Sequence, residues 1–169
     1  MKRQFFPILL VLCTIAVSCK NKASNEQTEN KDRAVAIDET SCYIASKGRD
    51  TAFIILHQVG QSITGKLNFM AYESDSRIGT VTSGKMNGAT LFAQYISAQE
   101  GMESDCEIAL LKKDSTYILS NDFYGSENYQ FNTDNTKGTF KDKRHIKFDG
   151  VVLKKIAYDS IKYLASKLY

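Results

Sequence analysis

Residues 62–72 read SITGKLNFMAY, and this stretch decides the fold class. Apolar and small residues occupy the odd positions from Ile63 to Ala71, whereas most even positions are polar. A period of two residues is typical of an antiparallel β-strand that buries one face and exposes the other. The buried face needs a core, so further strands are expected along the chain.

The same alternation recurs at regular intervals in the following 80 or so residues. It is found at 91–95, 108–110, 117–119, 129–131 and 146–148, and the continuous apolar run at 52–56 predicts a further strand. Turn signals separate these segments, and Asn87-Gly88 predicts a type I′ hairpin because both residues tolerate positive φ. Consecutive hairpins without intervening helices predict an all-β fold over residues 40–156. We expect an antiparallel meander of about eight strands that closes into a barrel, since closure removes exposed edges.

The last residues, 157–169, have a different period. Ile161, Leu164, Ala165 and Leu168 are spaced as on one face of a helix. This pattern predicts a C-terminal amphipathic helix, packed against a mouth of the barrel or its outer wall.

The N-terminus predicts export. Lys2 and Arg3 precede an apolar run at 5–17, which is too short to span a membrane and is typical of a signal peptide. Residues 16–19, Ala-Val-Ser-Cys, resemble the lipobox of bacterial lipoproteins. The resemblance implies cleavage after residue 18, lipid attached to Cys19 and anchoring in the cell envelope, with the outer membrane facing the periplasm as the expected location. Polar residues through 39 predict a flexible tether.

Charge argues against a nucleic-acid partner. The chain has 22 basic and 19 acidic residues, and removal of Lys2 and Arg3 leaves 20 against 19. A nearly balanced mature chain lacks the concentrated basic face that nucleic-acid binding requires.

Cys42 and Cys106 are the two remaining cysteines of the mature chain. In an oxidising compartment they could form a disulfide, which requires that their Cα atoms come within about 7 Å. They could also be two separate buried cysteines, or include a reactive thiol. No Cys-x-x-Cys motif is present, and no metal site or cofactor is predicted.

An enzyme would have to combine these thiols or a serine with one of two histidines. His57 and His145 could act as bases oriented by Asp50 or Glu73. Glu73 and Asp75 could also form a carboxylate pair, although they flank a predicted turn. No hydrolase or metalloprotease motif supports such a site, and the chain is predicted not to be an enzyme.

Two resemblances concern the domain itself. Segments such as Ile63-Thr-Gly-Lys-Leu67, Gly79-Thr-Val81 and residues 88–95, GATLFAQY, resemble a group of small uncharacterised lipoproteins of Bacteroidota. More distantly, the hairpin strands are similar to those of calycins, the lipocalin and avidin barrels. This chain has no tryptophan, so the tryptophan marks of both calycin groups are missing.

Nine tyrosines and nine phenylalanines could line a cavity or fill a closed core. The first alternative predicts a membrane-tethered, non-enzymatic barrel that binds a small apolar or amphipathic ligand. The second predicts a structural or protein-interaction lipoprotein of the envelope with a filled barrel. A hollow interior would favour the first.

Overall fold

The computed structural model describes residues 38–166; the predicted signal peptide, Cys19 and most of the tether lie outside the described residues. The described residues belong to one compact unit. Their strands are β1 Asp38–Lys47, β2 Asp50–Val59, β3 Ser62–Met70, β4 Arg77–Asn87, β5 Thr90–Gln99, β6 Met102–Lys113, β7 Thr116–Leu119, β8 Tyr129–Phe131, β9 Lys137–Phe140 and β10 Val152–Ile156. Two short 3₁₀ helices, η1 Asp122–Tyr124 and η2 Lys143–His145, and one α-helix, α1 Tyr158–Ser166, complete the fold.

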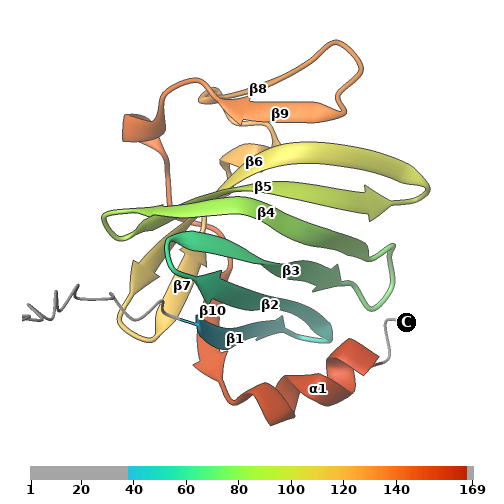
Figure 1. Cartoon of the computed structure of the whole chain (residues 1–169). Coiled ribbons are helices and arrows are strands. Elements are labelled where there is room, and N and C mark those ends of the chain that lie inside the picture. The colour runs from blue at the N-terminus through green and yellow to red at the C-terminus, as the bar shows by residue number, and fades with distance from the viewer. Residues whose placement is uncertain (1–37, 167–169) are drawn as a thin grey trace, which may run out of the picture. The chain divides into compact units, whose positions relative to one another are not determined.

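Eight antiparallel strands close into a barrel, as predicted. β1 to β7 follow one another as consecutive hairpins, and β5 pairs with β6 along its whole length. β10 then lies between β7 and β1 and pairs with both, which completes the ring. Figure 1 shows the hairpins curving around the barrel and β10 running behind β1.

The fold is not a simple meander, because residues 120–151 leave the barrel before β10 returns to it. Within this segment β8 and β9 form a hairpin, and β9 joins the edge of β6 in parallel next to Asp105 and Cys106. The strand predicted at 146–148 is absent. The backbone is extended at Ile146, but Lys147 N donates to the Asp122 carboxylate at 3.1 Å instead of to a neighbouring strand.

The hairpin predicted at Asn87-Gly88 forms one residue further on. Asn87 pairs with Thr90 as the last rung of the ladder, so Gly88 and Ala89 are the two loop residues. Of these two, Gly88 has positive φ, at 58°. The pattern of positive φ at both loop residues belongs to the β5–β6 turn, where Glu100 has φ 53° and Gly101 has φ 76°.

The barrel interior is filled by side chains. Ile54, Leu67, Val81, Ile108 and Leu110 are each 0% exposed and belong to one cluster. Tyr95 is also fully buried, and its hydroxyl donates to Leu67 O at 2.8 Å. Its ring lies across the backbone of Gly79, where a Cβ atom would be 2.4 Å from the ring.

Helix α1 covers part of the outer wall. Tyr43 and Ile54 point into the barrel, so their neighbours Cys42 and Phe53 point outward by alternation. Ile161 of α1 is 0% exposed and forms a second cluster with these two residues. Figure 1 shows α1 beneath β1 and β2. The predicted C-terminal helix is therefore present and packs on the wall.

Candidate functional site

One end of the barrel holds an apolar pocket of about 510 Å³. This end contains the β1–β2 turn, the loop after β3 and the start of β10, and we call the hollow there the mouth pocket. Its lining consists of Ala45, Ser46, Lys47, Asp50, Thr51, Ala52, Phe69, Met70, Ala71, Val151 and Val152. Its volume falls within the range of pockets that hold small molecules, about 300–1,000 Å³.

The mouth pocket forms because β1 and β10 separate. They pair from Cys42–Ile156 to Ile44–Lys154, and the ladder ends there. Beyond this point β1 continues with Ala45 to Lys47, while β10 approaches from Val151, so a wedge is left between the strands. Small side chains at Ala45 and Ala52 leave the wedge unfilled.

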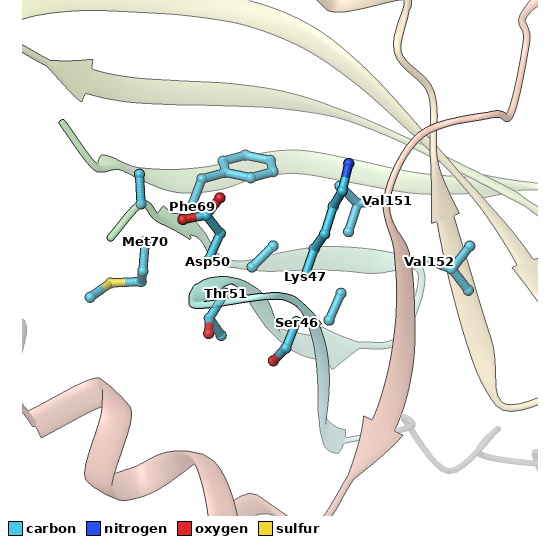
Figure 2. A pocket seen from close by; sticks show the side chains of 11 residues that line it. Ser46, Lys47, Asp50, Thr51, Phe69, Met70, Val151 and Val152 are labelled. Carbon is cyan, nitrogen blue, oxygen red and sulfur yellow. The ribbon is translucent and has the colours of Figure 1, made fainter. Parts of the chain in front are cut away.

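The pocket touches both faces of the barrel wall. Ala45, Ala52 and Phe69 pack against the interior cluster. Met70 packs instead against the outer cluster beneath α1. Figure 2 shows Phe69, Lys47 and Val151 on one side of the β1–β2 hairpin, with Ser46 and Thr51 on the other. A bound molecule could therefore contact apolar atoms on both sides of the hairpin tip.

Two charged side chains line the rim. Lys47 and Asp50 are paired in the β1–β2 register, yet they form no ion pair. Asp50 Oδ1 accepts a hydrogen bond from Tyr72 N at 2.9 Å, which ties the loop after β3 to the hairpin. The Arg49 guanidinium lies 4.2 Å from the centroid of the Tyr72 ring. Figure 2 shows the Lys47 ammonium on the side of Val151, away from the Asp50 carboxylate.

The opposite end of the barrel differs in chemistry. A smaller pocket of about 230 Å³ lies there between the starts of β1 and β7. Its lining includes Glu39, Lys112, Asp114 and Lys155, and the Lys155 ammonium lies 3.5 Å from Glu39. Charges of both signs already compensate one another at this end. An apolar ligand would therefore find few favourable contacts there.

Cys42 and Cys106 are both free and buried. Cys42 lies under α1 on the outer wall, and burial raises the pKa of its thiol. Cys106 is the register partner of Tyr95, whose side chain points into the barrel. The two thiols thus occupy opposite faces of the wall. Cys106 also lines a pocket of about 270 Å³ together with Arg77 and Tyr124.

In the part of the chain that the structure describes, the polar neighbours of the histidines do not include either thiol, although His57 lies only two residues along β2 from Ile55, the register partner of Cys42. His57 Nδ1 lies 3.1 Å from Thr40 Oγ1, and its Nε2 lies 3.8 Å from Asp38. His145 Nδ1 lies 3.0 Å from Asp142, which also accepts from Arg144. Among the described residues, neither histidine contacts a cysteine or serine through a hydrogen bond.

The predicted carboxylates do not converge either. Asp50 and His57 stand near opposite ends of β2. Glu73 and Asp75 are both exposed in the loop after β3. Asp75 is instead close to Glu100 of the β5–β6 turn, and the hydrogen bond between the two carboxyls raises the pKa of Glu100. Local sequence gave no signal for this pair, because it joins two separate turns.

Among the residues that the structure describes, the most buried carboxylate has a structural role. Asp122 is 2% exposed and accepts hydrogen bonds from Ser120 Oγ at 3.0 Å and from Lys147 N at 3.1 Å. Ser126 Oγ also donates to it, at 2.5 Å. These bonds hold η1 at the same end as the mouth pocket, where Phe123 enters the core with its ring centroid 6.4 Å from that of Phe69.

No group of three or more histidine, cysteine, aspartate or glutamate side chains in residues 38–166 could hold a metal ion. No helix within the same residues is long and apolar enough to cross a bilayer.

Among the mouth-pocket residues the sequence singles out Asp50, as a carboxylate that could orient a histidine, but it does not predict the pocket. Phe69 was assigned to a buried face, but nothing local indicated that β1 and β10 separate beside it. Comparison of the chain with protein-family models, curated proteins and solved structures finds no match. The resemblances to Bacteroidota lipoproteins and calycins therefore stay predictions.

Proposed function

We propose that this protein is a membrane-tethered lipoprotein whose barrel binds a small apolar or amphipathic molecule at its mouth, without catalysing a reaction. The observation that carries the proposal is the mouth pocket, with its apolar lining and about 510 Å³ of space. Cys19, which lies outside the described residues, supplies the proposed lipid anchor.

The proposal does not rest on a hollow barrel, the feature that would have favoured ligand binding, because the interior is filled. The interior is packed with fully buried side chains such as Leu67, Ile108 and Leu119. A ligand would therefore rest on the filled core, against Ala52 and Phe69, and not within it. Burial of apolar ligand surface supplies affinity at about 25 cal/mol per Å² before the costs of association.

Binding of a neutral fluorophore tests this proposal. We suggest 1-aminoanthracene, titrated into the predicted mature chain, residues 19–169, carrying Cys19→Ser to prevent lipidation. Saturable binding at one molecule per chain is expected, with a rise in fluorescence as the fluorophore leaves water.

A pocket-filling variant locates the binding. Val151→Trp places a large side chain in the mouth pocket, and at least tenfold weaker binding is expected. Val59→Trp is the matched control, because Val59 is 49% exposed at the opposite end of the barrel. Thermal melting of both variants establishes that they are folded. Equal binding by the two folded variants would refute the mouth as the site.

A protein-interaction role is the second candidate, favoured by apolar side chains on the outer wall. Ile78 and Ile96 are 43% and 46% exposed and line a pocket of about 390 Å³ over β3 to β6. Purification from the native envelope tests it. A stoichiometric partner seen by native mass spectrometry, and lost from Ile78→Ser/Ile96→Ser protein of unchanged melting temperature, would favour this role.

A further inference from the structure

We infer that the ligand of the mouth pocket is a single-chain amphiphile with one anionic head group, and that Lys47 binds that group. This inference rests on the proposed function and specifies the chemistry of its ligand. It follows from the charges at the rim and from the shape of the apolar lining below them.

The rim holds one cation that is available to a ligand. Lys47 has no hydrogen bond or ion pair with any described residue, although Asp50 faces it in the register. Asp50 Oδ1 already accepts a hydrogen bond from Tyr72 N. The Lys47 ammonium instead stands beside Val151, over the apolar lining (Figure 2). A lysine stem can follow an apolar surface while its ammonium remains in water.

The neighbouring cation, Arg49, is directed elsewhere. Its guanidinium stacks on Tyr72 at 4.2 Å from the ring centroid, and Arg49 does not line the pocket. The two cations lie two positions apart in the same turn and contribute the same charge to the field of the protein. A comparison of variants at the two positions therefore distinguishes a direct contact with the head group from a general electrostatic effect.

The lining below Lys47 suits one hydrocarbon chain. Ala45 of β1 lies beside the wedge, Ala52 and Phe69 continue the inward side of the pocket across β2 and β3, and Met70 of β3 lines its outward side. The wedge ends where β1 and β10 begin to pair, at Ile44 and Lys154. An extended chain can thus lie along the wedge with its head group at the open end, beside Lys47.

The experiment compares two amphiphiles of equal chain length. Sodium dodecanoate and dodecan-1-ol differ in the charge of the head group, and each is used to displace 1-aminoanthracene from the mature chain carrying Cys19→Ser. Dodecanoate should bind about tenfold more tightly than dodecanol, as expected for one charge-assisted contact.

Variants of the two cations test whether Lys47 causes the preference for dodecanoate over dodecanol. Lys47→Met keeps the apolar stem and should abolish the preference for dodecanoate, while dodecanol binding changes less than about twofold. Lys47→Arg should retain the preference. Arg49→Met, the matched control, should also retain it. Because Lys47 and Arg49 are exposed, unchanged melting temperatures are expected for all three variants.

The outcomes distinguish this inference from the proposed function. If 1-aminoanthracene binds at the mouth but dodecanol displaces it as well as dodecanoate does, the head-group assignment is wrong and the pocket remains. If Arg49→Met loses the preference for dodecanoate to the same extent as Lys47→Met, a contact between the head group and Lys47 is also refuted. If neither amphiphile nor the fluorophore binds, the proposed function itself fails.

Discussion

Gly79 shows how closely single residues are fitted inside the barrel. A Cβ atom at this position would lie 2.4 Å from Tyr95 Cε2 and 2.6 Å from Ile96 O. The first neighbour is a ring that is fully buried and tied to Leu67 O, and the second is backbone. Neither can move away without disturbing the ladder.

Gly79→Ala is therefore expected to destabilise the protein by about 1–3 kcal/mol, the usual cost of overpacking a filled core. Urea unfolding of the variant and of wild type measures the difference. Thr80→Ala is the control, because Thr80 is the exposed neighbour of Gly79 on β4. Equal stability of Gly79→Ala and Thr80→Ala would show that the Tyr95 ring is not held against the strand.

At the scale of elements, α1 is fixed to the wall through Ile161, the one residue of its predicted apolar stripe whose side chain is described. Ile161 is fully buried against Cys42 and Phe53. A short helix of this length is marginal on its own, so its stability depends on that contact. The buried thiol of Cys42 reports on whether the helix is in place.

Ile161→Ala is expected to lower the free energy that stabilises the packing of α1 on the wall by about 2–5 kcal/mol. The helix should then detach from the wall more often. Alkylation of Cys42 by iodoacetamide should then become faster, measured by mass spectrometry of the labelled peptides. Cys106, buried on the other face of the wall, provides an internal reference whose labelling rate stays unchanged. Lys162→Ala, at an exposed position of α1, should leave the Cys42 rate at the wild-type value. Parallel acceleration at both thiols would indicate global unfolding and contradict a local role of Ile161.

The elements also show where sequence reasoning works. Alternation identified the segments at 62–72 and 91–95 because each of these strands has one face in the core. The apolar run at 52–56 does not alternate because β2 packs against apolar side chains on both faces there. The same signal failed at 146–148. There Ile146 and Phe148 do pack against the core, but the backbone between them bonds to the Asp122 side chain and not to a strand. Side-chain alternation reports burial, and it does not identify the hydrogen-bond partner.

For the whole molecule, closure depends on β10, which fills the last position of the ring after an excursion of the chain. This non-local pairing could not be read from sequence, and the mouth pocket is its consequence. The pocket exists because β10 pairs with only part of β1. The barrel itself could be anticipated from strand number, whereas the site required knowledge of where two distant strands separate.

Tyr43 of β1 and Tyr117 of β7 meet inside the barrel from the two sides of β10. Their ring centroids are 4.9 Å apart with an edge-to-face orientation. Burial, with smaller contributions from Tyr43 and Glu39, raises the pKa of Tyr117 to about 12 from 10.0. A charged Tyr117 would have to leave the interior, and its departure would open the barrel wall beside β10.

Alkaline pH is therefore expected to destabilise the closed barrel. Between pH 10 and about 12 the unfolded chain loses the Tyr117 proton while the folded chain keeps it, so the folded state binds more protons and its stability falls as pH rises. This contribution is fully present below pH 10. Tyr117→Phe removes the titrating group, so its loss of stability over this window should be smaller than that of wild type, measured by urea unfolding at several pH values. Tyr158→Phe, at a residue 53% exposed, is the control and should follow wild type. The same decline in Tyr117→Phe as in wild type would mean that another group opens the barrel in alkali.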